Sequence, residues 1–315
     1  MKNYSCYFCG GFVYIVVQDT LRHGEKRDVL KCKKCDLVFL APYSGKDLEQ
    51  FYRSSEYRKK HSPVLGKAIT SKKMFEISLP LQAYRVSRIK PYLKKHMRVL
   101  EVGCSTGHFL HAIKPLAKEV SGIELNKAHA SFARKKLHTK ISEQEIERSG
   151  FSKNYFDIIC VYQVLEHIEN PREFLSALLP YLKKGGRIFI EVPNINDPLL
   201  TLYRIPSYQQ FYYHDAHLFY YSPKTLNRMM QSAGFSGKVA GFQLYNFLNH
   251  IHWLNTGKPQ ANSTIATGKP ILIADKKNKH ANILNEWVGG IDREYRVLLE
   301  KNLVSDCLLF IGKKK

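Results

Sequence analysis

A glycine loop between residues 98 and 110 constrains the fold of this chain more than any other segment. Residues 98–102 have the apolar content of a short buried strand, and Phe109 and Leu110 begin a helical spacing of apolar residues. Gly103 and Gly107 enclose the turn between them. A strand, a glycine loop and a helix in this order form a cradle in which backbone N–H groups approach a nucleotide. The middle glycine of the dinucleotide pattern Gly-x-Gly-x-x-Gly is absent, so the loop departs from a dinucleotide site.

A second strand is predicted at residues 119–124, and it ends in the acid Glu124. This acid lies ~20 residues beyond the loop, where a carboxylate accepts hydrogen bonds from the ribose hydroxyls of a nucleoside. Leu125 is expected to pack on the base, and Asn126 to cap a helix over residues 127–136. The alternative is an exposed glutamate without a ligand.

Several segments together resemble the class I S-adenosylmethionine (SAM) methyltransferases. The order Glu-x-Gly-x-x-x-Gly at residues 101–107 resembles motif I of this family. Residues 154–161 resemble its fourth strand, residues 162–171, with Leu-Glu-His-Ile, the segment after that strand, and residues 183–193 its fifth strand. The resemblance covers residues 97–193. It implies an α/β, Rossmann-like fold with a seven-stranded mixed sheet, helices on both faces, and SAM as the methyl donor.

The resemblance also implies which residues contact SAM. They come from the glycine loop, the end of the second strand and the segments around the fourth strand: Glu101, Gly103, Cys104, Ser105, Gly107, Glu124, Leu125, Glu145, Ile146, Tyr162 and Gln163. Glu145 would accept the exocyclic amine of adenine, with Glu143 as a rival for that role. Tyr162 and Gln163 would line the methionine end. The intact Glu101, loop glycines and Glu124 argue against a non-catalytic binding protein with a degenerate SAM fold.

Four cysteines near the N-terminus form two Cys-x-x-Cys pairs, Cys6 with Cys9 and Cys32 with Cys35. Four thiolates at this spacing surround one Zn²⁺ tetrahedrally, as in a zinc ribbon, and leave no open coordination position. We therefore predict a structural zinc. The alternatives are two disulfides or unrelated thiols, and the chain shows no signal-peptide segment that would favour disulfides. Strands are expected at residues 12–17 and 29–30, and the apolar residues 37–42 are expected to pack on a neighbouring element.

These patterns predict three domains. They are a zinc ribbon at residues 1–45, a helical linker or lid at 46–96, and a SAM-dependent methyltransferase domain at 97–315 with acceptor-binding insertions at 194–222 and 247–300. Within the linker, residues 47–60 and 71–95 are expected to be helical, with breaks at Pro80 and Pro91. Residues 238–246 and 305–312 are the expected last strands. Residues 257–269 are polar and predict a mobile loop.

The acceptor side is expected among the aromatic residues 203–221. Residues 217–223 (His-Leu-Phe-Tyr-Tyr-Ser-Pro) resemble a segment of bacterial methyltransferases that modify sugars or glycan precursors. Related sugar C-methyltransferases also begin with a cysteine-rich zinc module. The resemblance implies that His217 is a general base, with His167 and Tyr220 as further catalytic candidates. The alternatives are that His217 packs its loop against the sheet and that His167 has a structural or cofactor-side role. Trp253 is a candidate for stacking on the acceptor.

Lysine and arginine exceed aspartate and glutamate, and the formal net charge is +22. Such a charge favours anionic partners. We therefore expect a small-molecule acceptor, an anionic sugar or nucleotide-sugar, that receives a methyl group on a hydroxyl or a carbon. An RNA methyltransferase with a zinc module is the alternative, although the chain lacks an Asn-Pro-Pro-Tyr motif and a concentrated basic arm. No apolar run is long enough for a transmembrane segment, so a cytoplasmic protein is expected. The patterns do not predict the oligomeric state.

Overall fold

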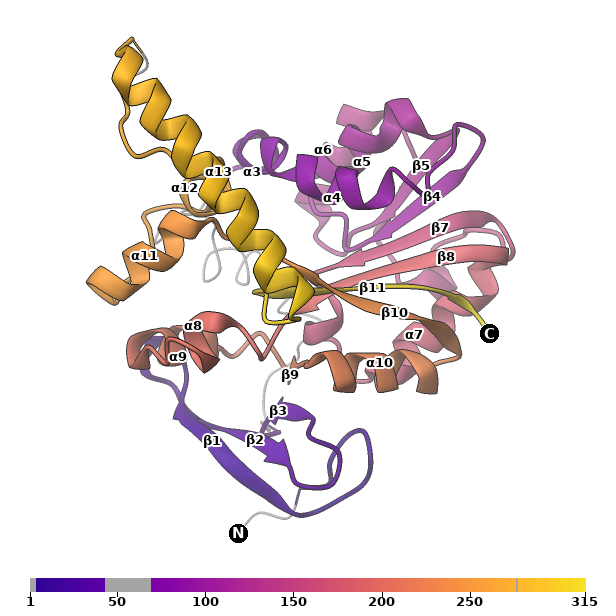
Figure 1. Ribbon diagram of the computed structural model, residues 1–315. Coiled ribbons are helices and arrows are strands. Elements are labelled where there is room, and N and C mark those ends of the chain that lie inside the picture. The colour runs from indigo at the N-terminus through magenta and orange to yellow at the C-terminus, as the bar shows by residue number, and fades with distance from the viewer. Residues whose placement is uncertain (1–3, 43–68, 276) are drawn as a thin grey trace.

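In the computed structural model, two β-sheets organise the described part of the chain, residues 4–42, 69–275 and 277–315 (Figure 1). The larger sheet has seven strands in the order β10-β11-β8-β7-β4-β5-β6. Neighbouring strands from β8 to β6 are parallel, whereas β11 runs antiparallel to both β8 and β10. The predicted seven-stranded mixed sheet is therefore confirmed. Its strands are β4 (Arg98–Val102), β5 (Glu119–Ile123), β6 (Ile141–Ser142), β7 (Phe156–Tyr162), β8 (Leu182–Pro193), β10 (Phe235–Phe242) and β11 (Cys307–Lys314).

Both faces of this sheet are buried, which is why its central strands are nearly continuous apolar runs. Along β7, Ile158 and Cys160 face one core, and Ile159 and Val161 face the other. The first core contains residues of α4 (Ala83–Ile89), α5 (His108–Ile113) and α6 (Lys127–Leu137), and α3 (Ser71–Ser78) packs on α6. The second contains residues of α7 (Pro171–Leu178) and α10 (Pro223–Ser232).

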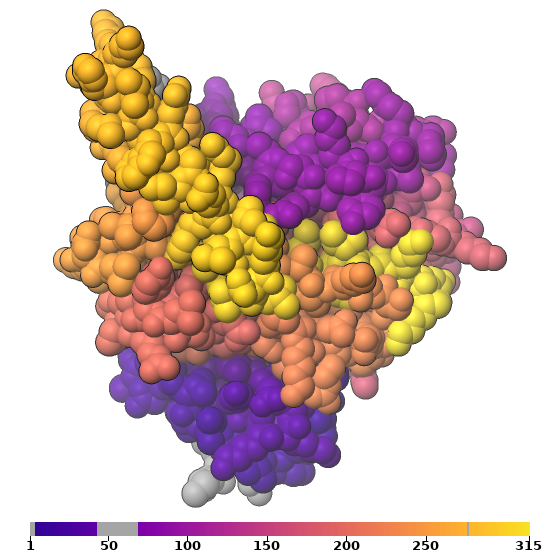
Figure 2. Space-filling model, viewed as in Figure 1, coloured from indigo at the N-terminus to yellow at the C-terminus, as the bar shows by residue number. Residues whose placement is uncertain are grey.

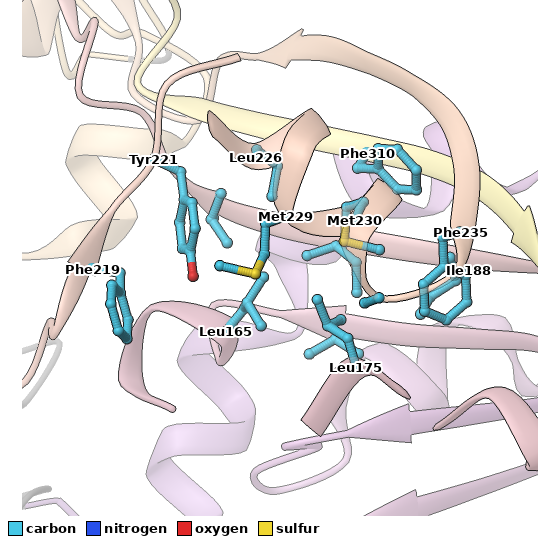
Figure 3. Packing of buried hydrophobic residues seen from close by; sticks show 14 of the residues in the cluster. Leu165, Leu175, Ile188, Phe219, Tyr221, Leu226, Met229, Met230, Phe235 and Phe310 are labelled. Carbon is cyan, nitrogen blue, oxygen red and sulfur yellow. The ribbon is translucent and has the colours of Figure 1, made fainter. Parts of the chain in front are cut away.

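Figure 3 shows how α10 covers its side of the sheet. Leu226, Met229 and Met230 recur at helical spacing and point from α10 towards Leu165 and Ile188 below. Ser222 caps the helix, because its side chain accepts the Thr225 backbone N–H and Thr225 returns the bond. Pro223 occupies the first turn, where its missing N–H costs nothing. The capping residues thus fix where α10 begins, and the apolar stripe fixes which face it buries.

The second sheet joins the N-terminal segment to the rest of the molecule. Its order is β1-β2-β3-β9, with β1 (Tyr14–Thr20), β2 (Lys26–Cys32), β3 (Val38–Leu40) and β9 (Phe219–Tyr220). The apolar residues 37–42 do pack on a neighbouring element, because β3 pairs antiparallel with β9. The N-terminal segment forms the lower end of the molecule in Figure 1. The helix predicted at residues 47–60 lies outside the described residues.

The C-terminal part adds helices at one edge of the large sheet. They are α8 (Pro198–Thr201), α9 (Pro206–Tyr212), α11 (Phe247–Thr256), α12 (Ser263–Thr267) and α13 (Lys279–Lys301). The prediction of a mobile loop at residues 257–269 is wrong, since α12 forms there and the Asn246 side chain donates to the carbonyls of Ile265 and Gly268. One end of α13 projects beyond the body in Figure 2. Within the described ranges, every helix is too short or too polar to span a lipid bilayer.

Candidate functional site

A cavity of about 680 Å³ lies where β4, β5 and β7 end, and its wall includes the residues that follow each strand. This is the edge of a parallel sheet at which α/β proteins bind ligands. The volume lies within the range of pockets that enclose small-molecule ligands. Residues from α3 and α4 complete the wall, so the segment before the glycine loop covers part of the opening.

The glycine loop after β4 is held against the end of β5. The backbone N–H groups of Gly103 and Cys104 both donate to the carbonyl of Ile123, at 2.8 and 3.0 Å. Gly103 has a φ of +77°, and a Cβ there would lie 2.3 Å from Cγ2 of Val164, which lines the cavity. Gly107 has a φ of +76°, and its Cβ would meet Leu137 of α6 at 2.6 Å. Gly103 therefore leaves room beside the cavity, and Gly107 lets α5 approach α6.

Glu124 stands at the end of β5 with its carboxylate fixed by two backbone groups. One oxygen accepts the Ser105 N–H and the other accepts the Asn126 N–H, each at 2.8 Å. Glu124, Ser105 and Leu125 all line the cavity. The side chain of Asn126 accepts the His129 N–H and caps α6, as the sequence predicted. The loop, the acid and the helix cap thus hold one another in place.

The structure distinguishes the two rival acids of the next loop. Glu145 and Ile146 line the cavity, and Ile146 is buried. Glu143 instead forms an ion pair with Arg134 on α6, and it is not among the described residues that line the cavity. Of the two acids, only Glu145 is therefore positioned to meet a ligand in this cavity.

A group of charged and polar residues, which includes Arg85, Glu101 and Gln163, forms part of the cavity wall. Arg85 donates from Nε and Nη2 to both carboxylate oxygens of Glu191, at 2.8 and 2.6 Å, and the Gln163 amide donates to the same carboxylate at 3.0 Å. Among the described residues, Oε2 of the buried Glu101 has no hydrogen-bond partner. Burial raises the pKa of Glu101 to about 8. Arg85 and Glu191 were not predicted from the sequence; an acid within the apolar run of β8 was the available signal.

Three residues meet at the other end of the cavity and all line it: Glu166, His167 and His217. We call them the histidine cluster. Oε1 of Glu166 lies 3.8 Å from Nε2 of His167 and 3.9 Å from Nε2 of His217. Glu166 is fully buried, and neither of its oxygens has a hydrogen-bond partner in the described part of the chain. Burial raises the pKa of Glu166 to about 8. The structure thus brings together two of the predicted catalytic histidines and an acid that the sequence analysis did not single out.

Three predicted site residues lie behind the cavity wall rather than on it. Of the described residues, the lining includes neither Cys104 nor Gly107 nor Tyr220. Tyr220 is buried, and its hydroxyl accepts the His214 N–H and donates to the His214 carbonyl. Tyr162 does line the cavity, with its ring edge-on to Phe109. Tyr220 therefore forms hydrogen bonds to the backbone within the aromatic segment.

Most of the aromatic segment 203–221 forms a core, which differs from the acceptor surface predicted for it. Tyr208, Tyr212, Tyr213 and Tyr220 are buried in one cluster with residues of β2 and β3. Trp253 is only 3% exposed and packs against Tyr208, so it cannot stack on an acceptor. The physical reason is that the small sheet packs against α8, α9 and α11 here, and large apolar side chains fill the space between them. Within this segment, His217 is the described residue that reaches the cavity.

The four N-terminal cysteines form a compact cluster. Sγ of Cys6 lies 3.5 Å from Sγ of Cys35, and Sγ of Cys9 lies 3.5 Å from Sγ of Cys32. All four sulfur atoms lie within 4.8 Å of one another. These separations exceed a disulfide bond of ~2.05 Å. They are close to the roughly 3.8 Å expected between sulfurs of a tetrahedral site with Zn–S bonds near 2.3 Å.

Comparison with known proteins agrees with this geometry. A family described as "Methyltransferase domain" matches residues 81–237, which include the glycine loop, Glu124 and the histidine cluster. An uncharacterized protein of Methanocaldococcus jannaschii is 30% identical over 162 residues, which are 50% of this chain and 76% of that protein. The chain belongs to the class I SAM-dependent methyltransferases.

Among named methyltransferases, a ubiquinone biosynthesis O-methyltransferase of Nitrosococcus oceani is 34% identical over 116 residues, 33% of this chain and 48% of the relative. The chain thus spans about half the length of this relative. A solved SAM-dependent methyltransferase from Archaeoglobus fulgidus has 23% identity and a TM-score of 0.49, covering 77% of this chain and 97% of that chain.

Proposed function

We propose that the cavity binds SAM and that the protein transfers its methyl group to a hydroxyl oxygen or a carbon of a sugar in a nucleotide-linked or surface-glycan precursor. The proposed binding of SAM rests mainly on Glu124. Two backbone N–H groups fix its carboxylate at the cavity wall. A carboxylate offers about four acceptor positions, so two remain for a pair of ribose hydroxyls.

The other lining residues fit the remaining parts of SAM. Leu125 and Ile146 offer apolar contact to adenine, and Glu145 an acceptor for its exocyclic amine. The unpartnered oxygen of Glu101 fits the ammonium of the methionine part, because a buried carboxylate without a partner is costly. Gln163 also lines the cavity, and we assign it to the methionine part of SAM. SAM, when bound, supplies an activated methyl group.

The histidine cluster is the proposed acceptor end. An acceptor hydroxyl, or a carbon beside a ketone, must lose a proton as it receives a methyl group, and a neutral imidazole can take it. His217 is the proposed base, and its Nε2 faces Glu166 across 3.9 Å. His167 is held by the bond between its Nδ1 and the Ala216 carbonyl, at 2.7 Å. The cluster therefore handles the proton, whereas the glycine-loop end holds the donor.

The choice of a sugar acceptor rests on two observations. Residues 217–223 resemble those of sugar-modifying methyltransferases, and the net charge of +22 favours an anionic acceptor. The name of the Nitrosococcus relative indicates methylation at oxygen, which agrees with a hydroxyl acceptor. An RNA substrate is the second candidate, favoured by the same charge.

The cysteine cluster is the proposed structural zinc site. Cys6, Cys9, Cys32 and Cys35 supply four sulfurs at the separations that a tetrahedral ion requires. Zinc would fix the two turns that flank β1 and β2 and so stabilise the small sheet. Because β9 belongs to that sheet, the zinc also supports the strand that follows His217.

Calorimetry and a transfer assay test the function. The protein should bind SAM, and absence of binding at millimolar SAM would contradict the proposal. With radiolabelled SAM, a panel of nucleotide-sugars should accept label while tRNA and rRNA fragments do not. Label on RNA, with an affinity that falls steeply with salt, would favour the second candidate. SAM binding without transfer to either class would instead favour a binding protein.

A further inference from the structure

The three side chains of the histidine cluster have a geometry that suits metal ligands as well as a proton acceptor. The carboxylate of Glu166 and the imidazoles of His167 and His217 present ligand atoms that all lie within 4.8 Å of one another. Ligands of a single transition-metal ion, bound at ~2.0–2.2 Å, lie roughly 3–3.5 Å apart. The two separations in the structure, 3.8 and 3.9 Å, would need to close by roughly 0.3–0.9 Å.

Glu166 provides an independent observation that points to a ligand at this position. The side chain is fully buried, and neither carboxylate oxygen meets a hydrogen-bond donor among the described residues. Buried polar groups in folded proteins are almost always satisfied, and a carboxylate is the most costly to leave alone. A cation between Glu166 and the two imidazoles would satisfy it.

The surroundings already orient the three side chains. The Ala216 carbonyl lies 2.7 Å from Nδ1 of His167 and accepts its N–H, and Nε2 of the same ring lies 3.8 Å from Oε1 of Glu166. The Leu218 N–H donates to the Glu166 carbonyl at 2.8 Å, so the two segments that carry the cluster are joined. A bond from the second ring nitrogen to a carbonyl is typical of histidines that bind metals.

We propose that Glu166, His167 and His217 bind a divalent transition-metal cation, and that this cation selects acceptors with two adjacent oxygen atoms. Two nitrogens and a carboxylate suit Mn²⁺, Fe²⁺, Co²⁺ or Zn²⁺ and leave coordination positions open towards the cavity. A vicinal diol, or a hydroxyl beside a carboxylate, can fill two of them. This inference rests on the proposed function and refines it, because His217 becomes a ligand instead of the base.

The methyl-transfer step balances without a further reactant. The bound hydroxyl is acidified by the cation and gives its proton to water. The oxygen then forms the new bond to the methyl carbon, the bond from that carbon to sulfur breaks, and its electron pair stays on sulfur.

Titration with Mn²⁺ tests the site, because Mn²⁺ has little affinity for thiolates and does not compete for the cysteine cluster. The protein is first dialysed against citrate, and the free-Mn²⁺ electron paramagnetic resonance signal is followed. One Mn²⁺ should bind per chain, and both Glu166→Gln and His217→Gln should weaken binding at least tenfold. Glu173→Gln is the matched control, since Glu173 lines the same cavity outside the cluster. No binding at millimolar Mn²⁺, or equal binding by Glu166→Gln, would overturn the inference.

Two further measurements distinguish failure of the metal site from failure of the proposed function and of the acceptor selection. If SAM binds by calorimetry but Mn²⁺ does not, only the metal site fails; if SAM does not bind, the proposed function itself fails. SAM binding by each variant also shows that it folds. Catechol, with adjacent hydroxyls, should bind at least tenfold more tightly with Mn²⁺ than without, and resorcinol, with separated hydroxyls, should show no gain. An equal gain for both would overturn the acceptor selection.

Discussion

The two ends of the cavity are built in different ways. The glycine-loop end comes from short segments at the ends of adjacent parallel strands, and its contacts are mostly backbone bonds, such as those from Ser105 and Asn126 to Glu124. The histidine end joins His167 to His217, 50 positions apart, and His217 is followed by β9, which belongs to the N-terminal sheet. The first end is specified locally, whereas the second exists only when distant parts of the chain have docked. The two ends should therefore respond to different perturbations.

The largest expected effect comes from replacing a single acid at the glycine-loop end of the cavity. Glu124→Ala removes the carboxylate proposed to accept both ribose hydroxyls. Charge-assisted hydrogen bonds contribute about 1.5–3 kcal/mol each, so SAM affinity should fall roughly 100-fold or more. Calorimetry measures this loss. Glu119→Ala is the control, because Glu119 starts the same strand and bonds to Tyr155. Equal losses for the two variants would mean that the site is not where we propose.

Removing metal from the cysteine cluster should affect the opposite end. A loss of about 3 kcal/mol would lower the unfolding midpoint by roughly 4–6 °C in a chain of this size. Because β3 pairs with β9, methyl transfer should decline while SAM affinity changes less than about threefold. Differential scanning calorimetry and SAM titration after treatment with a strong chelator measure both. A parallel loss of SAM affinity would show that the ends are not independent.

A pH effect is expected from Glu101 at the SAM end. Burial raises the pKa of Glu101 to about 8, above its ordinary value near 4.5. The folded protein therefore binds this proton more tightly than the unfolded chain, and its contribution to stability is lost as the pH rises towards 8. Glu101→Gln should flatten the decline of unfolding free energy between pH 5 and 8, by up to about 1.4 kcal/mol per pH unit. Urea unfolding across this range tests it; identical slopes for the two proteins would refute the assignment.

The smallest effect compares two neighbouring acids. Glu145 lines the cavity and Glu143 pairs with Arg134. Glu145→Gln should weaken SAM binding by a few-fold, about 1 kcal/mol, because the partly exposed carboxylate meets one amine. Glu143→Gln should leave SAM affinity unchanged. If the two results were reversed, the adenine would contact the loop differently.

The contrast between the two ends also explains what the sequence could predict. The positions of Gly103 and Glu124 and the helix cap at Asn126 could be predicted because each follows from a strand end and a few adjacent residues. Arg85 and Glu191 were missed because their pairing joins α4 to β8, which no local pattern reveals. Trp253 was misinterpreted for a related reason: an aromatic residue has the same local pattern whether it meets a ligand or packs in a core. Burial decided between the two, and burial depends on the fold.

The pairing of β3 with β9 also has a consequence for synthesis on the ribosome. Val38 pairs with Tyr220, so the N-terminal sheet cannot be completed until about two thirds of the chain has been made. Until then β3 has an unpaired edge, which is a site for wrong pairing between nascent chains. Early metal capture by the cysteines would hold β1 to β3 in shape during that interval. The order of events in the cell would then be metal binding first, completion of the N-terminal sheet second, and formation of the acceptor end of the cavity third.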